Sequence, residues 1–371
     1  MKKYVFLFLS LSLVSCTQND HPRDSNSDIF SISYDSLSDG NIIEEEMNCN
    51  YIKLQTTQDC RMSDIKRIYK DDSLLFILDS KDYVYLFDTC GTFIRKIGDK
   101  GKARNEYLKL IGMYIDKKND YVNILDFSRK DFIRYDYLGN FIDRISVPFD
   151  KINTAYDFVN TEDFLCCVNC NKKNVSEYNF TTLKWDNLKT TNLLKFSVTG
   201  KYLSIWDGGR ICKNSMGILA VTSFSDTIYK IGSNAVDPVF VLNGPLKECK
   251  VRDFENLHPD VELDICRDFL KEKKTTGLCY LYATDSIITF RYGFPCQVLI
   301  TYDIKEKRGK KMLLSNDFLS SNIIFSDNEC FIAVKTIIDC KRIEKERINA
   351  DFWNKILDSK EDDNPIIIIY K

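Results

Sequence analysis

Few residues of this chain have the types and spacing that enzymes use. The 371-residue sequence contains two histidines, His21 and His258, so a multi-histidine zinc site is excluded. It has no Gly-x-Ser-x-Gly elbow, no His-Glu-x-x-His pair, no phosphate loop and no acidic calcium-binding array. His258 precedes Pro259, a context typical of a surface loop and not of a general base. We therefore assign no catalytic residue and expect no cofactor.

Carboxylates are abundant, and two interpretations of them remain open. Asp79, Asp88, Asp126 and Asp136 each end an apolar segment, where an aspartate side chain can accept backbone N–H bonds and stabilise a turn. The alternative is a pair of acids that come together from different segments and hydrolyse or cleave a glycan. The turn interpretation is the simpler one, because all four positions recur at the same place in a repeat.

Aromatic and arginine side chains offer a binding site instead. The segment Trp206-Asp-Gly-Gly-Arg210 places an indole beside a carboxylate and a guanidinium, a combination that could stack on and hydrogen-bond to a sugar or peptide. Packing of Trp206 between structural elements is the alternative. The predicted ligand-binding residues are Arg129, Arg291, Tyr292, Trp206, Asp207, Arg210, Glu106 and Tyr107.

Fourteen cysteines are unusual for a chain of this composition. Cys166-Cys167-Val-Asn-Cys170 has a spacing that zinc sites can use, but strand alternation points Cys166 and Cys167 to opposite faces. Cys279 and Cys330 lie in apolar segments and have the character of small buried hydrophobes. We predict no metal site, and we expect a disulfide whose partners the sequence does not identify.

A repeat indicates which elements position these residues. Segments 73–79, 83–88 and 91–97 read as three short strands, and segments 121–126, 132–136 and 139–145 repeat them. Asp79 and Asp126 are 47 residues apart, and Gly91 and Gly139 are 48 apart. A period near 48 with about four strands is typical of a β-propeller blade.

Weaker copies extend the repeat to six blades. They comprise 163–168 and 176–180; 217–221, 227–231 and 238–242; 286–290, 297–302 and 310–314; and 330–334 with 365–370. The fold class is therefore all-β, a six-bladed β-propeller with two short helical insertions, at Asp260–Lys274 and Arg342–Leu357. The last blade lacks a strand, and we expect Tyr51–Leu54 to supply it and close the ring.

Propeller geometry would gather the predicted binding residues. The loops between second and third strands emerge on the same face as the connections between blades. Lys81, Arg129, Arg291 and Tyr292 are expected in the former, and Arg104, Glu106 and Tyr107 in a connection. We expect them to surround one mouth of the central channel.

The N-terminus has the pattern of a targeting signal. Lys2 and Lys3 precede an apolar stretch that is too short to span a bilayer and ends in Leu13-Val-Ser-Cys16. This pattern resembles a bacterial lipobox, which implies cleavage before Cys16 and lipidation of its thiol. We predict a signal peptide over residues 1–15, a flexible tether over 16–48 and the propeller over 49–371.

Several residues resemble a known family. Ile97-Gly98, Gly101, Glu106-Tyr107, the segment Phe224–Tyr229 and the terminal Asp363–Tyr370 resemble the six-bladed β-propeller lipoproteins of Bacteroidota, mostly uncharacterised and with NHL-like repeats. The resemblance implies the fold and an envelope location, but no substrate. This chain has Ala103-Arg104-Asn105 where those relatives tend to read Gly-Pro-Gly.

The composition argues against nucleic acid as a partner. A formal charge of −2 gives no clustered basic excess for nucleic acid. The sequence predicts an outer-membrane lipoprotein, periplasmic or surface-exposed, held by a lipid anchor at Cys16. Its predicted function is a binding or interaction module for a peptide, protein or glycan; the alternative is an envelope hydrolase or lyase with a carboxylate site at the mouth.

Overall fold

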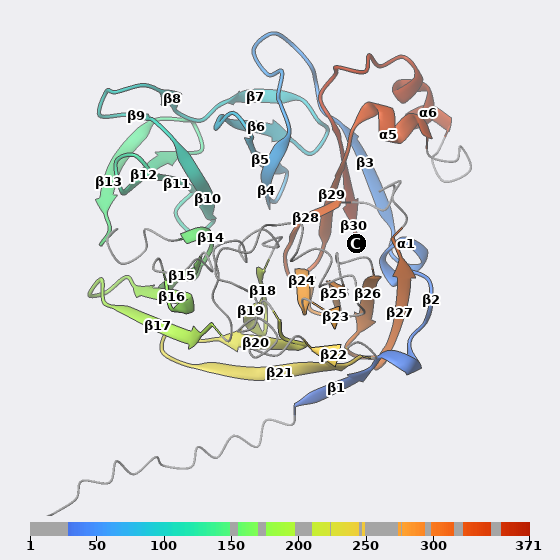
Figure 1. Ribbon diagram of the computed structural model, residues 1–371. Coiled ribbons are helices and arrows are strands. Elements are labelled where there is room, and N and C mark those ends of the chain that lie inside the picture. Colours follow the sequence, from blue (N-terminus) through green and yellow to red (C-terminus); the bar gives the residue numbers. More distant parts are fainter. Residues whose placement is uncertain are drawn as a thin grey trace, which may run out of the picture.

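Six four-stranded antiparallel units stand in a ring around a central channel (Figure 1). The computed structural model describes residues 29–148, 155–169, 176–196, 210–222, 224–244, 247–248, 274–275, 277–293, 298–314, 322–342 and 350–371. In each blade the strands follow one another outwards from the channel, and the innermost strands of neighbouring blades contact one another. The predicted fold class is confirmed.

The blades are numbered in chain order from the innermost strand outwards. Blade 1 is β4 (Ile65–Asp71), β5 (Leu74–Asp79), β6 (Val84–Asp88) and β7 (Phe93–Lys96). Blade 2 is β10 (Leu110–Asp116), β11 (Tyr121–Asp126), β12 (Asp131–Asp136) and β13 (Phe141–Ser146). Blade 3 is β14 (Ala155–Asn160), β15 (Phe164–Asn169), β16 (Tyr178–Lys184) and β17 (Thr190–Lys195).

Blade 4 is β18 (Ile211–Asn214), β19 (Gly217–Val221), β20 (Thr227–Ile231) and β21 (Val236–Asn243). Blade 5 is β24 (Leu278–Ala283), β25 (Ile287–Tyr292), β26 (Val298–Asp303) and β27 (Arg308–Leu313). Blade 6 is β28 (Asn322–Ser326), β29 (Phe331–Lys335), β30 (Ile366–Tyr370) and β3 (Cys49–Lys53). Two short parallel pairs, β8 (Asp99–Lys100) with β9 (Glu106–Tyr107) and β22 (Lys247–Glu248) with β23 (Lys274–Thr275), lie outside the blades.

The ring has two different faces. The face formed by the turns between the first and second strands of the blades is called the hairpin face. The opposite face carries the turns between second and third strands and the connections between blades, and is called the connection face. The blade cores are apolar on both sides of each sheet, as in β5 and β30, where nearly every residue is buried.

Aspartates stabilise the turns as predicted. Asp88 Oδ1 accepts hydrogen bonds from the backbone N–H of Cys90 at 2.9 Å and of Thr92 at 2.8 Å. Asp136 Oδ1 accepts one from the N–H of Asn140 at 2.7 Å. Asp79 and Asp126 likewise accept backbone N–H bonds, so the four acids have a structural use.

Blade 6 is closed by strands from both ends of the chain. β3 pairs with β30 in antiparallel register, with Cys49 opposite Tyr370 and Lys53 opposite Ile366, which confirms the expected pairing. Asn364 locks this junction from within: its side chain is 1% exposed and hydrogen-bonds to the backbone of Gln55, Cys60 and Met62.

The folded body begins earlier than predicted. β1 (Phe30–Ser33) pairs in parallel with β21, β2 (Ser38–Asp39) pairs in parallel with β27, and α1 (Ile42–Glu46) leads into β3. A 3-10 turn, η1 (Tyr34–Ser36), joins β1 to β2. The prediction of a tether up to residue 48 is therefore wrong over 30–48, because apolar side chains there are buried. We call residues 29–48 the strap, since they run along the outside of blades 4 and 5 to blade 6 (Figure 1).

The helical insertions are confirmed in part. α6 (Ala350–Leu357) lies within the predicted helix, and α5 (Ile337–Arg342) precedes it. The predicted helix over 260–274 falls outside the described residues, apart from Lys274, which begins β23. No helix in the described ranges is long and apolar enough to cross a membrane.

Candidate functional site

The central channel contains a cavity of about 460 Å³ at its hairpin face. All six innermost strands contribute to its lining: β4, β10, β14, β18, β24 and β28. Lys70 and Asp72 lie at its rim, where β4 turns into β5. Arg67, three residues earlier on β4, lies about 10 Å deeper at about 3.3 Å per residue. A volume of this size is in the range of small-ligand sites.

An irregularity of strand pairing recurs in blades 1, 2 and 3. The register between the first and second strands shifts immediately before Arg67, Gly112 and Asp157. Such bulges bend a strand and redirect its side chains. The three residues therefore hold equivalent positions, and two of the blades use that position for a charged side chain. At Gly112, a Cβ would approach the Phe158 ring to 3.0 Å.

Arg67 and Asp157 form an ion pair that links blade 1 to blade 3. The guanidinium Nη2 donates to Oδ1 of the carboxylate, and the backbone N–H of Phe158 donates to the same oxygen at 2.6 Å. The Arg67 side chain is 27% exposed and that of Asp157 is 7% exposed. Arg67 lines the cavity, so the pair forms part of its inner wall.

Burial and charge act against each other in this pair. Burial raises the pKa of Asp157, and the guanidinium of Arg67 opposes that rise. Burial lowers the pKa of Arg67, but Asp157, Tyr69 and Tyr282 together outweigh burial, and the net change in pKa is upward. Removing one partner would leave the other charge uncompensated in a low-dielectric wall.

Aromatic rings form much of the remaining wall. Tyr69, Tyr114, Tyr282 and Phe325 line the cavity. The Tyr69 and Phe325 rings meet edge to face, with centroids 5.2 Å apart. Burial raises the pKa of both Tyr69 and Tyr282, and so their hydroxyls stay protonated. The wall thus offers ring surfaces for stacking and hydroxyls for directional hydrogen bonds.

Charges at the rim are mostly engaged. Lys117 Nζ lies 3.5 Å from Asp71 Oδ1, and Lys213 Nζ donates to the carbonyl of Asn160 at 3.4 Å. Asp327 Oδ1 accepts the backbone N–H groups that follow it in its turn. Such exposed groups have weak fields, because water screens them.

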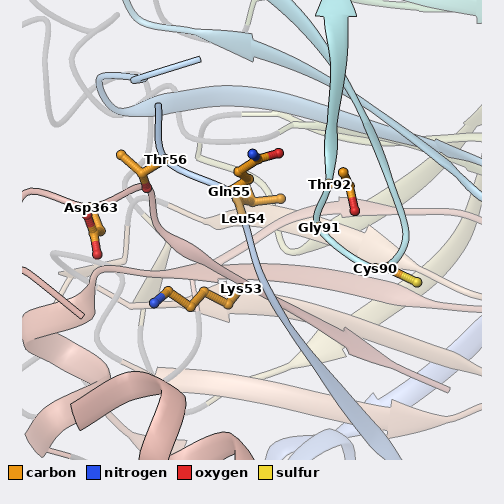
Figure 2. Close-up of a pocket in the computed structure, with 8 residues that line it drawn as sticks. All are labelled: Lys53, Leu54, Gln55, Thr56, Cys90, Gly91, Thr92 and Asp363. Atoms are coloured by element: carbon orange, nitrogen blue, oxygen red, sulfur yellow. The ribbon is translucent and has the colours of Figure 1, made fainter. Parts of the chain in front are cut away.

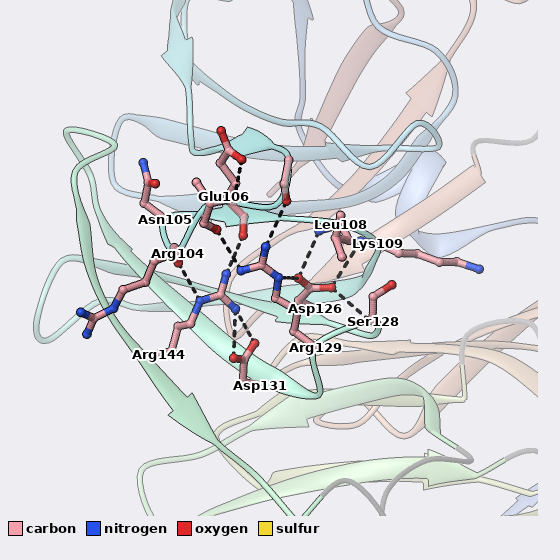
Figure 3. Close-up of polar contacts among 12 residues, drawn as sticks. Arg104, Asn105, Glu106, Leu108, Lys109, Asp126, Ser128, Arg129, Asp131 and Arg144 are labelled. Atoms are coloured by element: carbon pink, nitrogen blue, oxygen red, sulfur yellow. Dashed lines mark hydrogen bonds and ion pairs between the residues drawn. The ribbon is translucent and has the colours of Figure 1, made fainter.

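The predicted residues on the connection face instead pin the connection between blades 1 and 2 (Figure 3). Arg129 donates to the carbonyls of Ala103 at 2.9 Å and Gly101 at 3.3 Å. The Glu106 carboxylate accepts the N–H of Ala103 at 2.8 Å. These side chains hold the Ala103-Arg104-Asn105 turn in place.

Three further charged residues complete that network. Arg144 donates to the carbonyls of Arg104 at 2.7 Å and Glu106 at 2.5 Å, while Asp131 accepts two bonds from its Nη1. Asp126 accepts the N–H groups of Leu108 and Lys109 at 3.1 and 3.3 Å. Figure 3 shows the side chains of Arg129 and Arg144 extending toward the connection. The guanidinium groups of this cluster are therefore engaged by contacts within the protein.

Other predicted binding residues are buried. Tyr107 is 0% exposed, Tyr292 is 2% exposed and Arg210 is 2% exposed. Tyr292 packs against Tyr34 of the strap, with centroids 5.9 Å apart, so a ligand would reach it only by displacing that packing. Ligand contacts by this set stay a prediction.

Arg291 has a different setting. Its guanidinium lies 4.4 Å from the ring centroid of Tyr280, a residue with a positive φ of 52° on the innermost strand of blade 5. Burial lowers the pKa of Arg291. Of the predicted residues, Arg129, Glu106 and Tyr107 come together at one connection, and Arg291 and Tyr292 lie on β25. The first group belongs to the connection between blades 1 and 2, and the second belongs to blade 5. Trp206, Asp207, His258 and Cys16 fall outside the described residues.

Most of the described cysteines are buried, and Cys49 and Cys90 are exposed. Cys166 and Cys167 are both fully buried and pack into the cores on opposite sides of blade 3, as strand alternation predicted. Burial raises the pKa of Cys167 and of Cys212 to about 12. Cys279 is disulfide-bonded, and the other eight described cysteines are free. Over the described ranges, no cluster of side chains has the composition to hold a metal ion.

Two shallow grooves lie at the outer rim. One of about 420 Å³ lies between Lys53–Thr56 and the turn at 90–92 of the next blade. The other, of about 320 Å³, lies between β7 and the hairpin that contains Gly139. In Figure 2 the side chains of Lys53 and Cys90 extend in different directions, so they do not converge on one ligand position.

The sequence prediction missed the channel residues. Arg67, Asp157 and Tyr282 lie on innermost strands, which were not among the predicted segments. A usable signal was present in two blades: a charged residue stands 12 positions before the end of the second strand, Arg67 before Asp79 and Asp157 before Asn169.

Comparisons with known proteins support the fold. One similar crystal structure is that of a "Putative exported protein" from Bacteroides fragilis. It aligns with a TM-score of 0.74 at 18% identity, covering 92% of this chain and 99% of that chain. A member of the DUF4221 family from Bacteroides vulgatus aligns with a TM-score of 0.54 at 8% identity, covering 88% and 97%. A comparison with curated proteins gives no match. The family model described as "Domain of unknown function (DUF4934)" matches residues 30–371.

Proposed function

The chain belongs to the DUF4934 family, and we propose that it is a cell-envelope interaction module that binds its ligand in the central channel. The observation that carries this proposal is the 460 Å³ cavity at the hairpin face, walled by four aromatic rings and by groups from all six blades. Rigid inner strands hold these groups in place, which lowers the entropic cost of binding. A sugar unit or a short peptide segment fits this volume and chemistry.

Binding at the cavity is testable by a wall substitution. In thermal-shift and calorimetric screens of oligosaccharides and peptides, Phe325→Ala is expected to weaken the affinity of a cavity ligand about three- to tenfold, the range for loss of an aromatic contact. Leu138→Ala, at an exposed residue of the blade 2 rim, is the matched control and should leave affinity unchanged.

A third variant distinguishes the two mouths of the channel. Arg291→Ala tests the binding site predicted at the connection face. If every ligand found in the screen is insensitive to Phe325→Ala but loses affinity with Arg291→Ala, then the ligand enters from the connection face and the assignment to the hairpin face fails. Circular dichroism must show that each variant is folded.

The envelope location rests on the N-terminal signal. The lipobox pattern at Leu13–Cys16 would give an acylated protein anchored at the outer membrane, because several acyl chains together hold a protein firmly. Cys16→Ser is expected to abolish acylation and to move the protein from the membrane fraction to the soluble fraction. Retention in the membrane fraction with an unaltered mature mass would refute the anchor.

A further inference from the structure

The ion pair of Arg67 and Asp157 lies at the inner end of the channel cavity, and Arg67 is the member of the pair that lines it. The acids that line the cavity, Asp72, Asp327 and Glu329, lie in the turns at the rim. Rim acids are screened by water, whereas the inner pair acts through a medium of lower dielectric constant.

Arg67 is placed to receive an acidic group. It lines the cavity and remains 27% exposed, although one of its nitrogens already donates to Asp157. A guanidinium has five N–H donors in one plane and can bind a second carboxylate oxygen while it keeps its first partner. Asp157 lies behind it at 7% exposure, so the arginine is the partner that a ligand meets first.

We infer that the ligand of the cavity carries a carboxylate, which Arg67 binds at the inner end while the rings of Tyr69, Tyr282 and Phe325 contact the rest of the ligand. This inference rests on the proposed function, since it specifies the chemistry of that same site. Asp157 then has a second role besides holding Arg67 in place: it competes with the ligand for the guanidinium and limits the affinity for acids.

The competition predicts effects of opposite sign for the two partners. With benzoate and its neutral analogue benzamide as probes, the parent protein should bind the acid about tenfold more tightly, equivalent to about 1.4 kcal/mol for a charged hydrogen bond. Asp157→Asn should strengthen benzoate binding and leave benzamide unchanged, because the amide oxygen can still accept the N–H of Phe158. Arg67→Gln should reduce the acid-to-amide ratio to within about twofold, because the charge-assisted bond is lost.

Controls separate a binding role from a structural one. Arg134→Gln removes the guanidinium of an ion pair with Asp143 on the outer strands of blade 2 and should change neither probe. If Arg67→Gln lowers stability but keeps the acid-to-amide ratio, the pair is only structural and the inference fails. Equal binding of benzoate and benzamide to the parent refutes the acid preference while leaving the cavity as a binding site. Binding of neither probe also refutes it, and the proposed function itself fails only if the wider screen gives no ligand sensitive to Phe325→Ala.

Two natural sources of the carboxylate can then be separated. Digalacturonate against galactobiose tests an acidic sugar, and Gly-Phe against its C-terminal amide tests a peptide terminus. In each pair the acid should bind the parent protein more tightly than its neutral analogue, and this difference in affinity should disappear in Arg67→Gln. The pair with the larger advantage in the parent identifies the source, and absence of an advantage in both pairs contradicts the inference.

Discussion

Replacing Asn364 with alanine is expected to lower the free energy of unfolding by about 3 kcal/mol or more, at 1–3 kcal/mol for each buried partner left without its hydrogen bond. The side-chain amide donates to the carbonyls of Gln55 and Cys60, both at 2.7 Å, and its oxygen accepts the N–H of Met62 at 2.8 Å. These groups belong to the connection from blade 6 to blade 1, so the substitution weakens the closure of the ring.

Urea unfolding followed by circular dichroism measures the effect. Asn119→Ala is the matched control, because the Asn119 amide makes one exposed hydrogen bond, to Asp116 at 2.8 Å, and its loss should cost less than about 0.5 kcal/mol. Equal midpoints for the two variants would show that Asn364 does not hold the closure.

The double substitution Ile42→Ala and Ile43→Ala is expected to cost about 4 kcal/mol or more, since each large-to-small change in a core costs about 2–5 kcal/mol. Both side chains are 1% exposed and pack against blades 5 and 6. A flexible tether would tolerate the same change without loss.

Ile29→Ala provides the comparison within the strap. Ile29 is 51% exposed, so its truncation should alter the unfolding free energy by less than about 0.5 kcal/mol. Limited proteolysis gives an independent measurement: the double variant should be cleaved between residues 29 and 48 before the parent is. Identical cleavage patterns and midpoints would contradict a structural role for the strap.

The repeat made the fold predictable from the sequence. The second and third strands of blades 1 and 2, such as β5 and β11, are apolar at almost every position because both of their faces are buried, and their aspartate turns recur at a fixed period. The closing pair was predictable because the last repeat lacked one strand.

The innermost strands escaped prediction because they face two environments. β4 reads Ile-Lys-Arg-Ile-Tyr-Lys-Asp, with one fully buried residue and polar side chains toward the channel. Neither an apolar run nor a clean alternation marks such a strand. The bulge before Arg67 breaks the alternation further, so the candidate site went unnoticed for the same reason that its strands did.

The predicted mouth residues failed to indicate the cavity for a different reason. Arginine and carboxylate side chains in loops are common both in binding sites and in clamps that hold a loop. Arg129 and Glu106 have no sequence property that separates the two uses, and their partners are backbone groups that only the folded chain defines. The strap was missed because Phe30–Ser33 is short and follows a polar stretch, and its stability comes from strands far along the chain.

The strap also sets an order on folding. Phe30 and Ser38 of the strap pair with Phe240 and Lys310, and Cys49 of the following β3 pairs with Tyr370, so each of these segments is synthesised well before its partner. Contacts of such long sequence separation form slowly, because the loop entropy is lost before any contact compensates for it. During that interval the apolar side chains of Ile32, Ile42 and Ile43 lie exposed on a segment without its partners, which is the kind of surface that aggregates or binds a holding chaperone. A chain in this state needs protection until the five-residue strand β30 is available for pairing.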